Sequence, residues 1–540
     1  MVNVLRISWR RWQSMLIAIS LSVVSLCISS CSQSPLVTNH QLTASQAEHV
    51  LEFIPKHALL TAVINTTAKQ EKTWSQSNLY KALSEATDRF LTPLELDLNQ
   101  DIRPWMGETV AVAITNKDLD RDSRNGRQGG YLLVADTLDG DQLREFLEFF
   151  WQRQIVAGTQ PLLTQVSGVP IISGLVTQEN RQLATAIVGE HTLLVANDIK
   201  VLQQSVRVAQ TPTLQLSAQD CCKPIWLNIR IPDFIDWLGL ATPTGRYIMT
   251  APRWQQLSAT TAFHPKRLSI TTQLKALDSD RTSTTGEHYL PEVSTALEPY
   301  LPASLAWGAM GYDLRPLWTN LLNELNSYQR VPSSLAQGYG WLSTQLGQTL
   351  LEPITQLVSK EYAVGQLEDG TGLIAVVNTD PTLTRQLDTI AVQQGLSISQ
   401  LTLKDQLVTV WSRLKTRIND ARSREITVET DLIALHTKVD DYDIFSTSIE
   451  GLTTTLESPN DALINTQRFQ RSMKSIDISN QGYFYGTWDE IERLLASNRW
   501  FSLMKPIVQP WLQSIDAIAI TGYEQANNQS TGTISILLKD

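Results

Sequence analysis

The sequence predicts an α+β fold in which two tandem, related domains each pack helices against a mainly antiparallel sheet. Three observations lead to this prediction. The apolar segments of the 540-residue chain occur mostly as strand pairs joined by short turns, strand–helix–strand units of uniform spacing are few, and the order of elements in the first half recurs in the second. Hairpins and meanders build antiparallel sheets, so a doubly wound parallel sheet is disfavoured.

The start of the chain predicts an export signal. Three arginines, Arg6, Arg10 and Arg11, precede an apolar run from about Met15 to Ile28, which is the arrangement of a secretory signal peptide. The apolar run is too short for a membrane-spanning helix, which needs about 20 residues. We therefore expect residues 1–30 to be a signal peptide.

The apolar run ends at Ile28-Ser29-Ser30-Cys31, a sequence that resembles the lipobox of bacterial lipoproteins. The resemblance implies cleavage before Cys31, a diacylglycerol on its thiol and an acyl group on its new amino terminus. Several acyl chains, at about 0.8 kcal/mol per buried methylene, would hold the protein to a bilayer. Two alternatives stay open. One is an uncleaved signal anchor, which would also export the body because basic residues stay in the cytoplasm; the other is cleavage without lipid.

A chain of this length predicts two domains rather than one core. A polar tether over residues 31–44 is expected to join the anchor to the first domain, residues 45–277. A linker over residues 278–290 is expected to join that domain to the second, residues 291–540. The linker is predicted because the polar stretch that begins at Asp278 has no apolar periodicity.

Each domain is predicted to open with a short helix, a proline that ends it, and an apolar strand. Proline ends a helix because it lacks the N–H and restricts the residue before it, and Pro55 and Pro302 take this place. A buried strand, a polar cap and an amphipathic helix follow. The expected opening strands are 61–65 and 307–312, the next strands are 131–137 and 373–380, and the helices begin near Asp141 and Pro381.

Strands with tight turns and a strand-to-helix corner complete each domain. The tight turns predict strands at residues 191–196 and 452–456. At the corners an aspartate, Asp233 or Asp489, is placed to cap free N–H groups of the following helix. The corners are expected at 225–238 and 483–495, and the closing strand pairs at 258–263 with 268–274 and at 517–523 with 533–538. The second domain adds a long hairpin, 406–416 with 424–438, whose charged tip is 417–423.

Three segments resemble the DUF3352 family, an uncharacterised and mostly cyanobacterial group: Phe53–Ala58, Ile102–Glu108 and the strand Tyr131–Asp136. The resemblance covers most of the chain after the signal, in both halves, and consists of loose hydrophobic patterns. It implies no activity, cofactor or catalytic residue, because none is established for the family.

Composition argues against several classes of protein. The formal net charge is −10, and such a surface does not attract nucleic acid or anionic lipid. The four cysteines are Cys27, Cys31, Cys221 and Cys222. Since the first two belong to the signal and the lipidation site, no disulfide framework is expected. We interpret Cys221-Cys222 as free thiols; a strained bond between neighbours and a redox role stay open.

No metal site or catalytic motif is predicted. The seven histidines are scattered and no two are four residues apart, whereas zinc needs clustered ligands. Asp118–Gly126 partly matches a calcium loop but has Ser123 and Gly129 where that loop needs glycine and glutamate, so we interpret it as a loop between strands. Ser412-Arg413-Leu414-Lys415 matches a serine–lysine pattern without its companion motifs, and we interpret it as chance.

Tryptophans gather near the predicted strand-to-helix corners. Indole rings bury large areas, so we interpret these residues as core; the alternative is the wall of an apolar ligand groove. They are Trp226, Trp237, Trp307, Trp318 and Trp488.

Together these features predict an exported, lipid-anchored protein that faces the periplasm from the cell membrane or the outer membrane. We expect a non-catalytic binding, scaffolding or assembly role, with membrane lipid and an envelope protein as partners and without nucleic acid, cofactor or metal. The alternatives are an envelope hydrolase with a motif-free active site and a lipid-handling protein.

Overall fold

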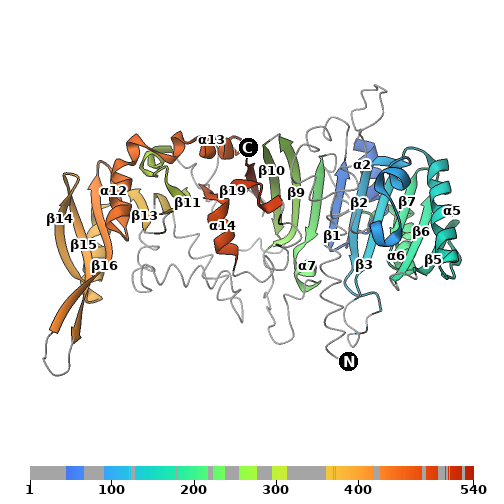
Figure 1. Ribbon diagram of the computed structural model, residues 1–540, viewed down its shortest axis with the longest axis horizontal. Coiled ribbons are helices and arrows are strands. Elements are labelled where there is room, and N and C mark those ends of the chain that lie inside the picture. Colours follow the sequence, from blue (N-terminus) through green and yellow to red (C-terminus); the bar gives the residue numbers. More distant parts are fainter. Residues whose placement is uncertain are drawn as a thin grey trace. The chain divides into compact units, whose positions relative to one another are not determined.

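The fold is α+β and mainly antiparallel, as predicted. The computed structural model describes residues 44–65, 91–120, 122, 128–176, 181–216, 223–237, 254–264, 266–276, 295–312, 360–368, 370, 372–418, 426–476, 482–496, 505, 509, 511–525 and 529–539. The chain divides into two compact units, with strands β1–β10 in the first and β11–β20 in the second (Figure 1).

The first unit forms an antiparallel sheet in which neighbouring strands follow the order β10-β9-β8-β1-β2-β3-β7-β6-β5-β4. The strands are Leu60–Asn65 (β1), Met106–Asn116 (β2), Gly130–Thr137 (β3), Leu162–Val166 (β4), Val169–Val176 (β5), Arg181–Val188 (β6), Thr192–Ala196 (β7), Ile225–Arg230 (β8), Trp254–His264 (β9) and Arg267–Ala276 (β10). The helices are Ala44–Leu51 (α2), Gly140–Val156 (α5), Ile199–Ala209 (α6) and Ile231–Trp237 (α7), with short helical turns Thr92–Leu94 (η1), Leu98–Ile102 (η2) and Pro212–Leu214 (η3).

The second unit forms a sheet with the order β20-β19-β18-β11-β12-β13-β17-β16-β15-β14. The strands are Leu305–Tyr312 (β11), Glu361–Leu367 (β12), Leu373–Asn378 (β13), Ser397–Leu403 (β14), Gln406–Ile418 (β15), Ile426–Val439 (β16), Tyr442–Ser446 (β17), Gly482–Thr487 (β18), Ile515–Gln525 (β19) and Gln529–Leu538 (β20). The helices are Pro381–Gln393 (α11), Ile449–Glu457 (α12), Gln467–Met473 (α13) and Trp488–Leu495 (α14), with short turns Thr295–Tyr300 (η5), Ser458–Asn460 (η6) and Leu463–Asn465 (η7).

The two strand orders match position by position, with β1 to β10 of the first unit in the places of β11 to β20 of the second. The match extends to small details outside the strands. Pro55 bridges to Gln215 in the first unit, and Pro302 bridges to Ala462 in the second. The long hairpin predicted for the second half is β15–β16, and it stands where β5–β6 stands in the first unit.

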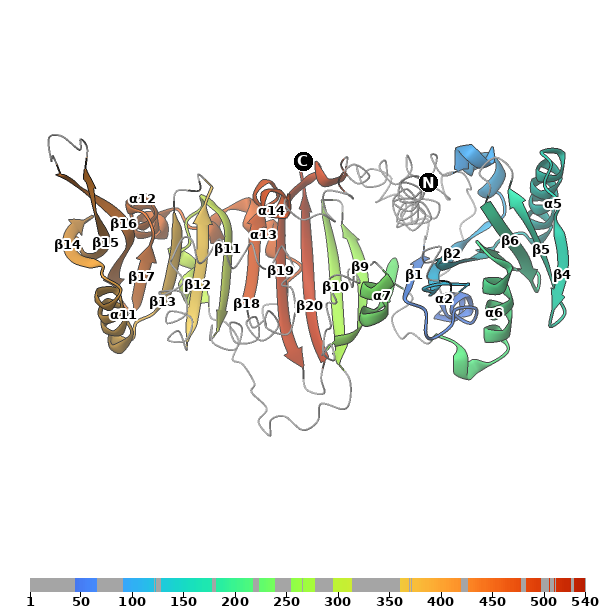
Figure 2. The ribbon, with the colours of Figure 1, turned by 90° about the horizontal axis from the view of Figure 1, so that it is seen from below.

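Helices cover both faces of the first sheet (Figure 2). Leu132 and Val134 of β3 pack in the core that includes α2 and α6. Leu133 and Ala135, on the opposite face of the same strand, pack in the core that includes α5. Because both faces are covered, β2 is buried almost throughout its length, and its middle part, Val110–Ile114, is apolar without alternation.

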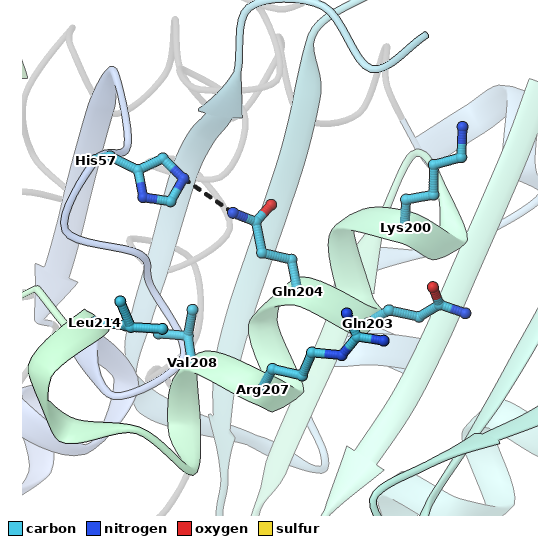
Figure 3. Close-up of a pocket in the computed structure, with 7 residues that line it drawn as sticks. All are labelled: His57, Lys200, Gln203, Gln204, Arg207, Val208 and Leu214. Atoms are coloured by element: carbon cyan, nitrogen blue, oxygen red, sulfur yellow. Dashed lines mark hydrogen bonds between the residues drawn. The ribbon is translucent and has the colours of Figure 1, made fainter.

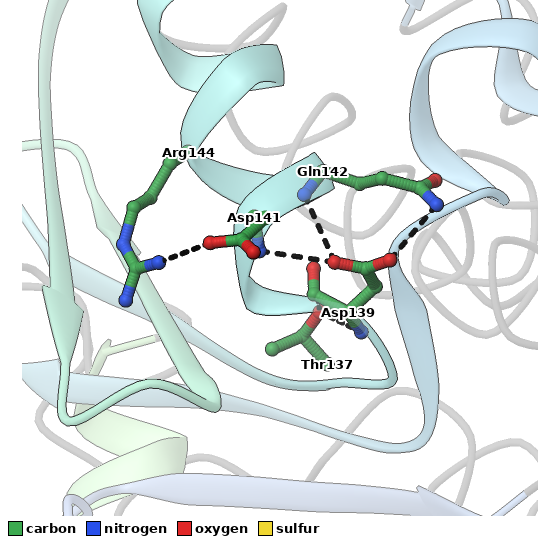
Figure 4. Close-up of polar contacts among 5 residues, drawn as sticks. All are labelled: Thr137, Asp139, Asp141, Gln142 and Arg144. Atoms are coloured by element: carbon green, nitrogen blue, oxygen red, sulfur yellow. Dashed lines mark hydrogen bonds and ion pairs between the residues drawn. The ribbon is translucent and has the colours of Figure 1, made fainter.

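Helix α5 begins where its sequence predicts. One carboxylate oxygen of Asp139 accepts hydrogen bonds from the backbone N–H groups of Asp141 (3.0 Å) and Gln142 (3.1 Å) (Figure 4). The other carboxylate oxygen of Asp139 accepts a hydrogen bond from the side-chain amide of Gln142 at 2.9 Å. These bonds satisfy N–H groups that have no partner within the helix. Asp380 caps α11 in the same way, through the N–H of Thr382 at 2.8 Å.

The second sheet is also covered on both faces. Leu452 of α12 and Phe469 of α13 pack in one core with Val376 of β13. Leu387 of α11 packs in the other core with Val377 of the same strand. Helices α6 and α12 therefore each pack on a sheet face through their apolar sides, with their polar sides exposed.

The prediction of a strand at residues 452–456 is wrong. These residues lie in α12, which Ser448 caps by accepting a hydrogen bond from the N–H of Gly451 at 2.9 Å. Threonine favours strands, but here three threonine hydroxyls donate to carbonyls one turn earlier in the helix. The strand of this region is β17, which pairs with β13 and β16.

The capping role predicted for the corner aspartates is not what the structure shows. The residue before α14 is Thr487, and it makes no side-chain cap; Asp489 lies inside the first turn, where it still suits the helix dipole. The carboxylate of Asp233 in α7 forms ion pairs with Lys117 at 2.6 Å and Arg230 at 2.9 Å.

No helix of the described part is both long and apolar enough to cross a membrane. Several predictions fall outside the described residues. The predictions concerned are the signal peptide with Cys31, nearly all of the tether, the linker 278–290, the pair Cys221-Cys222, Trp318 and most of the hairpin tip 417–423.

Candidate functional site

A groove of about 370 Å³ lies on the first unit, between α6, the turn that follows α2 and the short helix η3. Lys200, Gln204 and Arg207 line it from α6, and His57 lines it from the turn (Figure 3). Gln203, Val208 and Leu214 complete the lining. The volume is at the lower end of the range of small-ligand sites.

The walls of the groove are held by hydrogen bonds between segments far apart in the sequence. The Ser205 hydroxyl of α6 donates to the carbonyl of Phe53 at 2.8 Å. The N–H of Lys56 donates to the carbonyl of Leu214, and the N–H of Leu216 donates to that of Ile54, both at 2.9 Å. The turn after α2 is thus fixed to α6 and η3 in the folded chain.

The orientation of α6 follows from its sequence. Asp198 caps the helix through the N–H of Lys200 at 2.8 Å, and Val201, Leu202 and Val206 are buried against the sheet. Positions three, four and seven residues apart share a face of a helix. Burying the apolar side therefore turns Lys200, Gln203, Gln204 and Arg207 toward the groove.

The groove is cationic although the chain as a whole is acidic. Lys200 and Arg207 are exposed, and neither forms an ion pair within the part of the chain that the structure describes. Seven residues of α-helix place them about 10 Å apart along the helix axis. Val208, which is buried, and Leu214 add apolar surface.

His57 faces Gln204 across the groove (Figure 3). Its Nε2 lies 2.9 Å from the Gln204 amide nitrogen; because that nitrogen donates, Nε2 accepts and the ring is neutral with its proton on Nδ1. Partial burial lowers the pKa of His57 below 6.5, and the positive charges of Arg230 and Lys56 lower it further, while Asp233 raises it.

A network of charges supports the turn that carries His57. Arg230 donates to the His57 carbonyl at 3.2 Å and pairs with Asp233 at 2.9 Å. Lys117 bridges Asp233 and Asp236 at 2.6 and 3.0 Å. Burial would lower the pKa of Lys117, but its bonds to the two aspartates outweigh burial and raise it.

A second polar cluster lies inside the second unit. The Asp388 Oδ1 atom of α11 accepts a hydrogen bond from the Trp411 indole at 2.8 Å and lies 3.0 Å from His436 Nε2. Trp411 and His436 are buried, and their ring centroids are 5.2 Å apart. The cluster fastens α11 to β15 and β16, which is a structural role.

Comparisons with known proteins identify the family. A family model described as "Protein of unknown function (DUF3352)" matches residues 14–539. The chain belongs to this family.

The predicted DUF3352 resemblance is therefore confirmed. Among solved structures, crystal form IV of TP0453 aligns with a TM-score of 0.25 and 11% identity, over 42% of this chain and 79% of that one. Crystal form III of TP0453 aligns with a TM-score of 0.24 and 13% identity, over 42% of this chain and 80% of that one. A search of proteins with curated descriptions found no match.

The other residues singled out in the sequence do not gather at one site. Trp226, Trp237 and Trp488 are buried in the first and second units, and Trp307 is half-buried and donates to Gln366 at 3.0 Å. Ser412 and Lys415 lie on strand β15. The loop from Asp118 joins β2 to β3, and no group of three potential metal ligands occurs within the described ranges.

Sequence reasoning did not find the groove. His57 was counted among scattered histidines, and the polar face of α6 matches the solvated face of any surface helix. One signal was present: Lys200 and Arg207 occur on one helical face without an acidic residue at i±3 or i±4. The sequence could not show that the side chains of His57 and Gln204, which are 147 residues apart, lie in contact.

Proposed function

We propose that the protein is an exported, lipid-anchored binding protein of the cell envelope, and that its role is non-catalytic. The observation that carries the proposal is the groove of the first unit, whose rim holds two cations without acidic partners among the described residues. Unpaired charge beside apolar surface, in a rigidly held concave site, suits ligand recognition. The carboxyl groups whose pKa burial raises, Asp136, Glu298 and Asp443, do not line this groove.

The two units are proposed to be related domains that arose by duplication. The identical strand order supports this. Counting from the capping residues, Asp198 of α6 and Ser448 of α12, the places of Lys200 and Arg207 hold Glu450 and Glu457. Glu457 pairs with Lys404 at 2.5 Å. The cationic groove is therefore proposed as a specialisation of the first domain.

Attachment to the membrane is proposed to occur through an acylated Cys31, with the body in the periplasm and the anchor in the cell membrane or the outer membrane. Metabolic labelling with a tritiated fatty acid tests this proposal in the full chain and in Cys31→Ser. Label in the native chain alone is the expected result. Unlabelled native chain in the cytoplasmic fraction, still beginning at Met1, contradicts it.

The binding role is tested separately from the anchor. Native protein and the Lys200→Gln/Arg207→Gln variant are recovered from detergent extracts of envelopes, and their bound components are compared. A component held by the native chain and lost from the variant is expected. A screen with generic esterase, peptidase, phosphatase and glycosidase substrates provides the opposing test: turnover abolished by a single substitution makes the protein an enzyme and overturns the proposal.

A further inference from the structure

The two cations of the groove are spaced rather than clustered. Lys200 and Arg207 lie two helical turns apart, about 10 Å along the axis, and both border the same groove. A compact anion such as inorganic phosphate would have to draw the two long side chains toward each other, and this costs side-chain conformational entropy. A ligand with two acidic groups at a similar separation can use both cations without that movement.

The surface between the cations is polar and uncharged. Gln203 lies between them on α6 and borders the groove, and its amide can both donate and accept hydrogen bonds. Gln204 is already engaged by the neutral ring of His57. Amide groups of this kind match the N–H and C=O groups of a peptide backbone, while Val208 and Leu214 can contact its carbon atoms.

The charges of the groove and of the whole protein favour a peptide over a nucleic acid as the ligand. The rim cations differ in kind: the Arg207 guanidinium can hold a carboxylate through two parallel hydrogen bonds, and the Lys200 ammonium acts as a point charge. A peptide in the extended polyproline II conformation rises about 3.1 Å per residue with three residues per turn. Acidic side chains at i and i+3 then lie on one face, roughly 9 Å apart, which is close to the axial spacing of the cations. A nucleic acid is disfavoured because the chain carries a net charge of −10 and would repel a long polyanion beyond the groove.

We propose that the groove of the first unit binds an extended acidic peptide segment, with one carboxylate at Lys200 and a second, about three residues away, at Arg207. This inference rests on the proposed binding function and names its ligand class. Each cation holds one acidic side chain, and the two contacts are separate because about 10 Å lies between them.

The experiment is a titration of the full-length protein in detergent with a fluorescent, terminally blocked peptide, Glu-Gly-Gly-Glu, followed by fluorescence anisotropy at low ionic strength. Lys200→Gln and Arg207→Gln are each expected to raise Kd about fivefold, since each removes one exposed ion pair. The double variant is expected to raise it about 25-fold, because contacts this far apart are close to additive. Replacing one glutamate of the peptide by glutamine should cost the native protein about fivefold.

Matched controls separate the groove from general charge effects. Lys275→Gln removes a positive charge from an exposed position on β10, which does not border the groove, and should leave Kd unchanged. Lys200→Arg should restore most of the affinity. Equal loss in Lys275→Gln, equal binding of the peptide with one acid, or no binding of the native protein at millimolar peptide each overturns the inference.

The outcome is distinguishable from failure of the proposed function. If the peptide does not bind but an envelope component is still lost from the double variant, the binding role stands and the acidic-peptide ligand is wrong. If the peptide does not bind and no envelope component is lost from the double variant, the binding role and the acidic-peptide ligand are both wrong.

Discussion

The Nε2 atom of His57 lies 2.9 Å from the side-chain amide nitrogen of Gln204. This contact joins the turn after α2 to the middle of α6 across the groove. Because the amide donates to it, His57 is held as a neutral ring, so the groove has two cations on α6 and an uncharged imidazole on the opposite wall.

Acid is expected to strengthen binding of the acidic peptide. As the pH falls below 6.5 and through the lowered pKa of His57, the ring gains a proton and adds positive charge to a wall that already faces Lys56, Arg230 and Asp233. Titrations between pH 7 and pH 5.5 test this, above the range where free glutamate is protonated. His57→Gln should show no such gain in affinity. An equal gain in that variant would mean that a group other than His57 causes the effect.

The lowered pKa of His57 also makes the stability of the protein depend on pH. The unfolded chain binds the proton of His57 before the folded chain does, because the folded pKa is lower. The free energy of unfolding should therefore decrease as the pH falls through 6.5 toward the folded pKa. His57→Gln should remove this part of the decrease, as measured by denaturant unfolding across that pH range.

Asp388 is expected to be important for the stability of the second unit. In Asp388→Ala the buried Trp411 indole N–H and His436 lose their shared acceptor. Leaving such groups unsatisfied should cost about 2 kcal/mol, visible in denaturant unfolding. Asp388→Asn keeps an accepting oxygen and should lose less; equal losses would mean that the charge, rather than the hydrogen bonds, matters.

The cap of α5 gives a pH-dependent prediction. Hydrogen bonds from Gln142 and Asp141 outweigh desolvation and lower the pKa of Asp139 below 3.8. Its stabilisation is thus present above pH 3.8 and is lost as the pH falls through the lowered folded value. Asp139→Ala should melt at a lower temperature than the native chain at pH 7, and the gap should shrink in acid.

Asp139→Asn is the matched control, because asparagine caps helices without a titrating group. It should melt close to the native chain at neutral pH. A melting temperature of Asp139→Ala equal to the native value at pH 7 contradicts the capping account (Figure 4).

Gly482 should tolerate no side chain. It has a φ of 146°, and a Cβ there would lie 2.3 Å from the carbonyl oxygen of Met310 on the paired strand β11. Gly482→Ala should cost about 3 kcal/mol from overpacking and strain. Gly370→Ala, at φ 70° with no atom of the described residues within 4 Å of its Cβ, should cost about 1 kcal/mol. Comparing the unfolding free energies of the two variants separates steric overlap from backbone strain.

Much of the local structure was predictable because it depends on neighbouring residues. Asp139 and Asp380 mark helix starts through bonds to N–H groups two and three residues away, and Pro55 and Pro302 mark the turns before β1 and β11. The error at residues 452–456 has a different origin. Threonine-rich sequence fits a strand or a helix, and here the helix buries Leu452 against the sheet.

The amino-acid sequence by itself carried the family resemblance that the family model confirms. It also determined the α+β class and most element positions, since these follow from apolar periodicity, caps and turns that act over a few residues. Only the tertiary structure decided the groove. His57, Lys200 and Arg207 become neighbours because the β1–β2–β3–β7 pairing brings the turn after α2 beside α6, and no spacing along the chain carries that information.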